Sequence, residues 1–566
     1  DGRTSSYNEL AFGTKSLWDM KQVEIYRGAQ SYAQGRNAIA GAVVMTSNDP
    51  TQEWEGAAKL NMGNHRLAQT AALISGPVVK DELAFRLSVD HQQRETAVDL
   101  PHYDPVGNPR WFKATNTRAK LLWTPSALPD LYSRLTFNHL NARAPQSETE
   151  LQPNSPRYTP ERPVFQTRSA STIWDIGYQL SEHWKWENKL VYTHFIHDRK
   201  TTSPFNTALP PNRRGVPARV DGNEFQIEPI VKYESEKYRG LFGLFYFNVK
   251  QDESVTMLNG RIARTPITTN FNDKTKTKAA FGEITFTPDI PFELTLSARY
   301  EQEHHQRKGK SAMFSINRDK KYNVFLPKAD IAWKINDDQR LGFKVGKGYN
   351  PGGAGVTFGV PYTSYEYDAE YVWNYELYHR WTSTDKHLRI NSNLFYNDYK
   401  DMQLPFTLGP NSIVIRNADK VVTYGAEINT EWQATEKLAL NAGIGMLKTD
   451  IKRYPNSGIE GNKLARAPSF SGKVGANYRL LDHLEIGTNY SYNSSYYSTA
   501  DNLANGKVGH YDQLDVYLAY DFKHARITLY ADNVLNSRKD ILLVPRSGDI
   551  TRQPERQIGL STELRF

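Results

Sequence analysis

The chain has 566 residues, no cysteine, a formal charge of +8 at neutral pH and a mean hydropathy of −0.64. The lack of cysteine excludes a disulfide scaffold and a thiolate metal site, and no run approaches the roughly 18 to 20 apolar residues of a membrane-spanning helix. Two classes are left: a large soluble β protein, or a membrane β-barrel, whose alternating strands escape hydropathy windows. Aromatic residues make up 12% of the chain and many lie near expected strand ends, which favours a barrel with aromatic girdles.

The first 50 residues predict two short strands joined by glycine-containing turns. A strand over residues 23–25 turns at Arg27-Gly28, a second turn follows at residues 35–37, and an apolar strand covers residues 42–45. Glycine and asparagine tolerate the backbone angles that such turns need.

Past Pro50 the sequence repeats one theme, in which alternating segments are joined by short turns and, between these, by long polar connections. The long connections include residues 93–115, 144–167, 199–222 and 351–370. The short turns contain Gly, Pro, Asp, Asn or Ser. They lie near residues 79–82, 125–129, 181–183, 235–237, 288–291, 336–338, 383–385, 434–436, 481–482 and 523–524. These turns separate two-strand units and predict about 22 strands, the size of a plugged outer-membrane barrel.

The C-terminal segment illustrates the alternation. One face is apolar and ends on an aromatic residue, whereas the other is small or charged and would suit a wet lumen. The first face holds Ile558, Leu560, Thr562, Leu564 and Phe566, and the second holds Gly559, Ser561, Glu563 and Arg565. A soluble sandwich has the same period of two, but a terminal phenylalanine on an outward face resembles the sorting signal of bacterial outer-membrane barrels.

Motifs in both parts of the chain resemble the TonB-dependent receptors of bacterial outer membranes. In the first part, the resemblance to the end of the family's plug domain is carried by Glu24, Arg27, Gly28, Gly35, Arg36, Asn37, Ala38 and Gly41. In the second part it is carried by GYNPGG at residues 348–353, NYEL at 374–377, NDYKDMQ at 397–403, YGAE at 424–427 and ADNVLN at 531–536. The order of these motifs is similar to the ferric-siderophore branch of the ferric-yersiniabactin receptor type.

The resemblance implies an all-β fold: a 22-stranded antiparallel transmembrane β-barrel, residues 51–566, with the C-terminal part of a plug domain, residues 1–50, inside its lumen. A complete plug in this family is longer and opens with the TonB box. We therefore expect the first part of the plug, with the TonB box, to lie outside this sequence.

In the resembling family, the segment after an Asp-Gly turn rises to the plug apex and meets the ligand. Here that segment follows Asp1-Gly2, and Arg3, Tyr7, Asn8 and Phe12 are the predicted ligand contacts. Arginine offers a fork of donors to oxyanions, and tyrosine combines a flat face with a hydroxyl. An ordinary solvated loop would show the same residues.

The outer loops supply a second group of candidates. Tyr349, Tyr362, Tyr365 and Tyr367 could line one face of a ligand-binding loop, or the last three could form an aromatic girdle against lipid. Arg213 and Arg214 could attract an anionic ligand, or pair with lipopolysaccharide phosphates.

The resemblance also implies that Glu24 and Arg27 anchor the plug by meeting opposite charges on the barrel wall. Such buried pairs are specific but stabilise little. Enzyme motifs for nucleophilic, metal-dependent or phosphate chemistry are lacking, so we predict no catalytic residue. The cluster around His304 and His305 is not expected to bind a metal, because neighbouring residues of a strand point to opposite faces.

Together these patterns predict an outer-membrane transporter driven by TonB with ExbB and ExbD, most simply an importer of a ferric siderophore. No resident cofactor is expected, since iron would arrive as a chelate in the substrate. Cobalamin, heme, another metal chelate or an oligosaccharide remain alternative cargoes, and a passive porin-like channel is a further alternative. Outer-membrane lipid and lipopolysaccharide are expected to surround a monomer, and nucleic acid is not an expected partner because basic residues do not cluster with aromatic ones.

Overall fold

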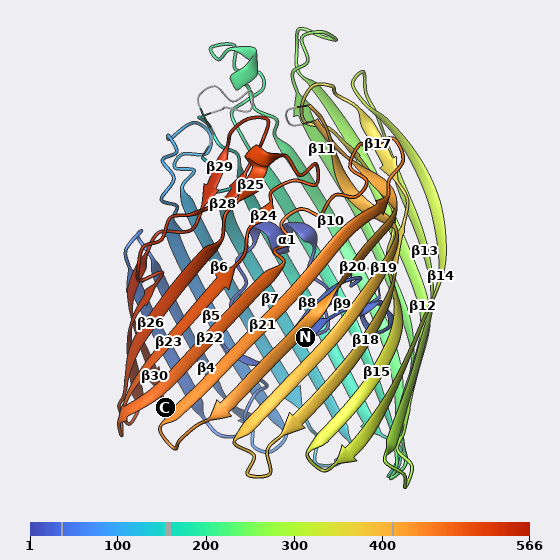
Figure 1. Cartoon of the computed structure of the whole chain (residues 1–566), viewed down its shortest axis with the longest axis vertical. Helices are drawn as coiled ribbons and strands as arrows, with labels where there is room; N and C mark the ends of the chain where they lie inside the picture. Colours follow the sequence, from blue (N-terminus) through green and yellow to red (C-terminus); the bar gives the residue numbers. More distant parts are fainter. Residues whose placement is uncertain (36–37, 151, 153–159, 410–411) are drawn as a thin grey trace.

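A closed β-barrel forms most of the computed structural model, which describes residues 1–35, 38–150, 152, 160–409 and 412–566 (Figure 1). Within these residues the wall has 22 strands, as the turn pattern predicts. They are β3 (Glu55–Gly63), β4 (Ala68–Val79), β5 (Leu83–Glu95), β6 (Trp111–Trp123), β7 (Leu131–Pro145), β8 (Val164–Gln179), β9 (Trp184–Lys200), β10 (Ala218–Glu234), β11 (Tyr238–Met257), β12 (Ile267–Phe286), β13 (Phe292–Lys310), β14 (Ser315–Asn336), β15 (Gln339–Asn350), β18 (Glu370–Thr382), β19 (Leu388–Gly409), β20 (Ser412–Gln433), β21 (Leu438–Arg453), β22 (Phe470–Leu481), β23 (Leu484–Asn493), β26 (Tyr511–Asp521), β27 (Ala525–Asp532) and β30 (Gln557–Arg565).

Each wall strand pairs antiparallel with the next, and the sheet closes because β30 pairs with both β27 and β3. At the closure Leu564 lies opposite Ala58 on one side and Ala525 on the other. Closure matters because lipid offers no partner to an unpaired backbone N–H or C=O group.

Side chains alternate along the wall as predicted. On β13, Leu294 and Leu296 are exposed on the outer face, whereas Ser297 and Arg299 are buried toward the lumen. Ile558, Leu560 and Leu564 of β30 are likewise exposed. The outer face therefore carries an apolar belt and the inner face carries polar side chains, as a membrane barrel with a filled lumen requires.

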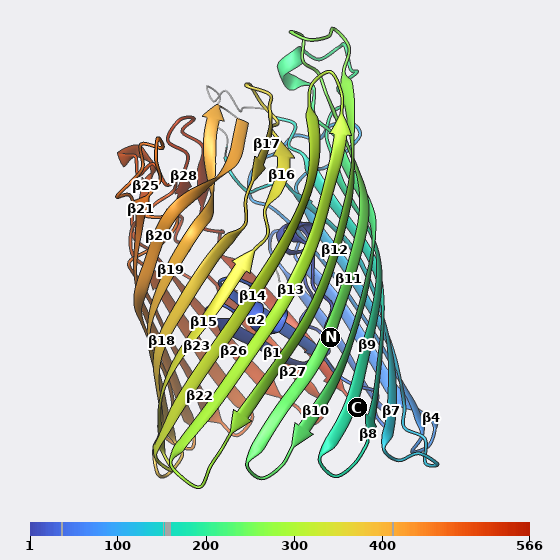
Figure 2. The ribbon, with the colours of Figure 1, turned by 90° about the vertical axis from the view of Figure 1, so that its right-hand side faces the viewer.

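All ten predicted short turns fall at junctions between consecutive wall strands. The long connections are shorter than predicted, because the strands continue beyond the apolar belt: the connection expected at residues 199–222 spans only residues 201–217. Not every connection on that side is long, since β3 and β4 are joined by residues 64–67, and β13 and β14 by residues 311–314. Strands β11 to β14 extend farthest on the side of the long connections, as Figure 2 shows.

The plug segment, defined here as residues 1–50, lies inside the barrel (Figures 1 and 2). It contains α1 (Tyr7–Phe12), β1 (Met20–Arg27), α2 (Ser31–Gln34) and β2 (Gly41–Ser47). β1 and β2 pair antiparallel, with Ile25 opposite Val43. Arg36 and Asn37 of the plug motif lie outside the described residues. The division between domains at residue 50 stays a prediction.

Smaller elements lie in the outer connections. They are η1 (Pro211–Arg213), β16 (Gly353–Val356), β17 (Ser364–Tyr367), β24 (Tyr496–Tyr497), η2 (Ala504–Gly506), β25 (Lys507–Val508), β28 (Asp540–Leu543) and β29 (Ile550–Arg552). None of the helices among the described residues has the length and apolarity to cross a bilayer.

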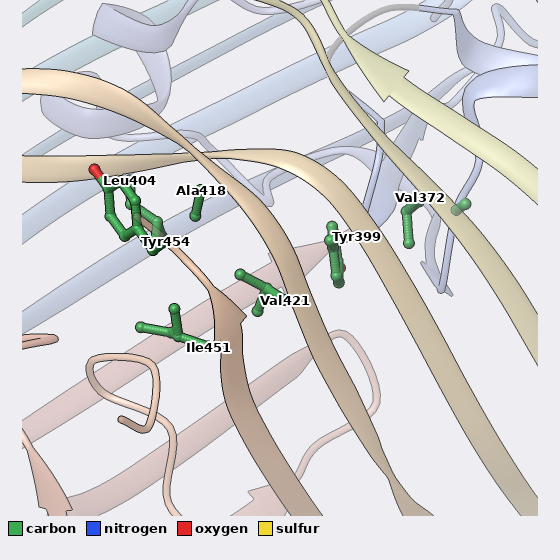
Figure 3. Close-up of a cluster of buried hydrophobic side chains, with 8 residues drawn as sticks. Val372, Tyr399, Leu404, Ala418, Val421, Ile451 and Tyr454 are labelled. Carbon is green, nitrogen blue, oxygen red and sulfur yellow. The ribbon is translucent and has the colours of Figure 1, made fainter. Parts of the chain in front are cut away.

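Apolar side chains also pack on the inner side of the wall, where β18 to β21 meet the plug segment (Figure 3). Val372, Tyr399, Val421 and Ile451 are buried there, and Ala29 of the plug segment joins them. The plug segment is therefore packed against the wall by apolar contact as well as by polar contacts.

Candidate ligand site at the plug apex

Helix α1 forms the apex of the plug segment, under the outer loops (Figure 1). Ser6 caps its N-terminus: the Ser6 hydroxyl accepts the Glu9 N–H at 3.3 Å, and the Glu9 carboxylate accepts the Ser6 N–H at 2.8 Å. This reciprocal capping box satisfies two N–H groups that a helix start leaves free. The capping box is the local sequence feature that marks this helix. A helix of six residues is too short to be stable alone, so the cap contributes to its stability.

A buried ion pair fixes the base of α1. Arg3 donates from Nη1 and Nη2 to the two oxygens of Glu9, each at 2.9 Å, and the Glu9 side chain is 0% exposed. Burial alone would raise the pKa of the Glu9 carboxyl, but the charge and hydrogen bonds of Arg3 outweigh burial and lower the pKa to about 2. Glu9 is therefore ionised at neutral pH and holds Arg3.

The other predicted apex residues divide into exposed and packed ones. Tyr7 is 78% exposed and Leu10 is also exposed, so α1 presents an aromatic and an aliphatic side chain on its free side. Asn8 is partly exposed. Phe12 stacks on Phe165 of β8, with ring centroids 3.8 Å apart, and so attaches the helix to the wall. Tyr7 and Leu10 are thus the free surface of the apex.

Tyr349 is buried between the wall and the plug segment, and it does not line an outer loop. Its side chain is 0% exposed, and its hydroxyl donates to Glu301 inside the wall. Its backbone N–H donates to the Ser31 hydroxyl at 3.2 Å, so it also meets α2 of the plug segment. Tyr349 therefore joins plug and wall, and offers no exposed surface to a ligand.

The three loop tyrosines sit on or beside a small hairpin. Tyr365 and Tyr367 belong to β17, which pairs with β16, and their rings stack with centroids 6.3 Å apart. Tyr362 packs against a buried cluster that includes Val255 and Phe271. β17 is not a wall strand, so these tyrosines do not belong to the outward-facing belt, the alternative left open by the sequence.

Arg213 and Arg214 occupy the connection between β9 and β10. The Arg213 guanidinium pairs with Glu161 of another outer connection, with Nε 3.2 Å from the carboxylate. Arg214 donates from Nε to the Leu209 carbonyl at 3.0 Å. Both side chains already stabilise loops.

The predicted anchors differ from each other. Arg27 donates to Glu427 of β20 at 2.6 Å, so it does meet an opposite charge on the wall. The two side chains are 59% and 26% exposed, whereas a buried pair was expected. Glu24 accepts a hydrogen bond from its neighbour Tyr26. An exposed pair of this kind is typically worth between 0 and about 1 kcal/mol.

Stronger plug contacts were not predicted from the sequence. Arg86 of β5 donates to Asp19 of the plug segment at 2.5 to 3.0 Å, with both side chains buried. Lys328 of β14 donates to the Tyr32 hydroxyl at 2.8 Å. No local pattern marks these pairs, because their members lie 67 and 296 residues apart in the chain.

Metal-ligating side chains do not gather anywhere in the described part of the chain. Around the two adjacent histidines, His304 pairs with Asp319 on the outer face at 2.6 Å, whereas Glu301 and Glu303 are buried on the inner face. The structure thus combines a polar-lined barrel, an apolar outer belt and an internal plug segment clamped to the wall, which is the architecture of a plugged outer-membrane receptor.

Comparison with known proteins identifies the family. The sequence matches the family described as "TonB dependent receptor-like, beta-barrel" over residues 110–536, and the chain belongs to that family. It is accordingly an outer-membrane β-barrel protein and not an enzyme.

Individual relatives are distant. The pesticin receptor of Yersinia pestis is 22% identical over 306 residues, which cover 51% of this chain and 44% of that protein, so the chain matches less than half of that protein's length. The crystal structure of the ferric yersiniabactin uptake receptor FyuA from the same organism superposes with a TM-score of 0.82 at 18% identity, covering 98% of this chain and 86% of that one. The copper transporter OprC superposes with a TM-score of 0.76 at 13% identity, covering 96% and 86%. At these identities the structural likeness shows the fold alone.

Proposed function

We propose that this chain is the barrel and part of the plug of an importer that brings a ferric siderophore across the outer membrane. The ligand would bind at the apex, and TonB with ExbB and ExbD would supply the energy. No chemistry is done on the cargo, and iron enters as part of the chelate.

The exposed side of α1 carries this proposal. Tyr7 and Leu10 project from a helix that Glu9, Arg3 and Phe12 hold in place. A flat aromatic side chain with a hydroxyl, on a fixed support, suits a chelate that has both apolar and oxygen-rich faces. Asn8, next to Tyr7, adds donors and an acceptor.

The names of similar structures support a metal chelate as cargo, since one is a ferric yersiniabactin uptake receptor and another a copper transporter. Cobalamin, heme, other chelates and oligosaccharides are competing cargoes for the same site. A passive channel is the competing mechanism, and the clamped plug segment argues against it.

Growth assays test the proposal. A deletion strain that carries the natural full-length gene is grown under iron limitation on a panel of iron-loaded siderophores, with copper chelates, heme and cobalamin as parallel arms. We expect growth on at least one ferric siderophore and loss of that growth when Tyr7 is replaced by Ala.

Tyr26→Ala is the matched control, because Tyr26 is an exposed tyrosine of the plug segment outside α1. Equal loss in both variants would contradict a ligand site on α1. Growth only on heme, cobalamin or copper would replace the cargo and keep the site. Stable open conductance steps of the wild-type protein in planar bilayers would favour a passive channel instead.

A further inference from the structure

The outer surface of β11 to β14 carries exposed lysines above the apolar belt, and six of them lie between the belt and Lys310, the last residue of β13. We call this surface the lysine face; its members are Lys250, Lys274, Lys276, Lys278, Lys308 and Lys321. On β12 the lysines alternate with the buried Thr275 and Thr277, so they point away from the lumen.

The register arranges the lysine face in rows directly above apolar ones. Leu244, Ala280, Tyr300 and Phe325 lie opposite one another across the four strands and form the top row of the belt. On β12, Lys278 lies two residues from Ala280 in the direction of the long connections. Lys276 and Lys274 occupy the next two positions on the same face. Side chains on one face of a strand repeat about every 7 Å, so the first cationic row begins within one such step of the belt.

Like charges on this surface are close together. Lys250 lies directly opposite Lys274 in the ladder, and directly opposed like charges are destabilising. Lys321 lies in the same row as Lys276, with His304 between them. Such an arrangement favours an anion that binds across several strands.

The carboxylates Asp252 and Asp319 on this surface are hydrogen-bonded to side chains other than the lysines. Asp252 accepts from Asn272 at 2.7 Å, and Asp319 accepts from His304 at 2.6 Å and from Gln306 at 2.8 Å. Among the described residues, none of the six lysines has a carboxylate oxygen within 4.0 Å. Two lysines elsewhere at this level are paired: Lys420 lies 3.8 Å from Asp398, and Lys452 lies 2.5 Å from Asp450, although Lys420 also lies opposite Lys400 in the ladder.

The surface also has a hollow. A groove of about 730 Å³ runs over β10 to β13. Its lining includes the basic residues Arg219, Lys250, Lys274 and Lys308 and the acidic residues Asp221, Asp252 and Glu253. It opens on the side of the barrel that the long connections occupy, which in such barrels is the cell exterior.

We propose that the lysine face binds the phosphate groups of a phosphorylated glycolipid of the outer leaflet, with the acyl chains lying on the apolar rows below. The chemistry is that of a phosphate monoester, which carries up to two negative charges and three acceptor oxygens. Lysines beside a membrane attract anionic headgroups, and a bisphosphorylated headgroup can contact more than one row. This inference depends on the outer-membrane location and not on the proposed cargo.

The test uses the full chain in phosphatidylcholine nanodiscs, with bisphosphorylated lipid A as the probe and native mass spectrometry as the readout. The variant K274Q/K276Q/K278Q neutralises the central lysines, and K420Q/K448Q/K452Q is the matched control on β20 and β21. We expect the first variant to lose about 100-fold in affinity, from about fivefold per lysine, and the control to change by less than about threefold. Retained folding is checked by the heat-dependent shift in gel mobility.

Three further arms separate the sources of negative charge. Dephosphorylated lipid A and phosphatidylglycerol should bind more weakly than the bisphosphorylated probe, and raised salt should weaken binding because exposed charges are screened. Equal affinity for phosphatidylglycerol, equal losses in the two triple variants, or full displacement by inorganic phosphate would each overturn the proposal.

Discussion

The Arg3–Glu9 pair leads to a quantitative prediction about the plug apex. Glu9→Gln keeps the shape of the side chain but removes the charge that holds Arg3. Because one pKa unit corresponds to about 1.4 kcal/mol, a pKa lowered from 4.5 to about 2 means that the charged form stabilises the docked apex by about 3 kcal/mol. The value is of the size found when one partner of a buried ion pair is removed, about 3 to 5 kcal/mol.

The pH dependence has a definite sign. Since the pKa of Glu9 is lower in the docked state, its contribution is fully present above pH 4.5 and is lost as pH falls from 4.5 toward 2. A carbon-13 titration of the glutamate carboxyls should therefore show one signal, absent from Glu9→Gln, that titrates near pH 2.

Hydrogen–deuterium exchange at neutral pH measures the consequence in the helix. A loss of about 3 kcal/mol in local opening free energy should speed exchange of the α1 amides by about 100-fold. Glu24→Gln is the control, because Glu24 accepts a hydrogen bond only from its exposed neighbour Tyr26 among the described contacts. Unchanged protection of α1 in Glu9→Gln, or a Glu9 signal that titrates near pH 4.5, would refute the reasoning.

Four other substitutions test how the plug segment is held. Arg86→Ala should release Asp19 at a cost of about 3 to 5 kcal/mol and raise permeability to large antibiotics. Arg27→Ala breaks an exposed pair, so it should cost less than about 1 kcal/mol and leave permeability unchanged. Equal leakage in the two variants would contradict this ranking. Gly35→Ala should speed amide exchange of α2, because Gly35 has φ +75° and a Cβ there would lie 3.1 Å from Arg299 and Glu301. Unchanged exchange would argue against a tight fit of α2 on the wall. Tyr349→Phe should cost about 1.5 to 3 kcal/mol through loss of the bond to Glu301, but it keeps the backbone bond to Ser31 and should leave ligand affinity unchanged. A gain or loss of ligand affinity would restore Tyr349 as a ligand contact.

The wall could be predicted from sequence because its signals are local. A period of two and turn residues at the junctions give the strand number directly. Strand ends were less predictable, since the outer half of a strand keeps its alternation beyond the lipid. β14 illustrates this, with Asn317, Asp319 and Lys321 on the outer face well above Phe325.

The site was less predictable because its contacts are remote. Tyr349 meets Ser31 across 318 residues of sequence, and nothing local shows that its side chain is buried. The lysine face was hidden for a related reason. A charge of +8 over 566 residues looks dispersed, and only the register of β11 to β14 brings the lysines together.

Uptake of radiolabelled iron tests the central claim most directly. Cells that express the natural full-length protein are given the ferric siderophore that supports their growth, with and without a functional TonB. The account predicts accumulation that requires TonB and falls in Tyr7→Ala but not in Tyr26→Ala. Accumulation at the same rate without TonB would contradict it.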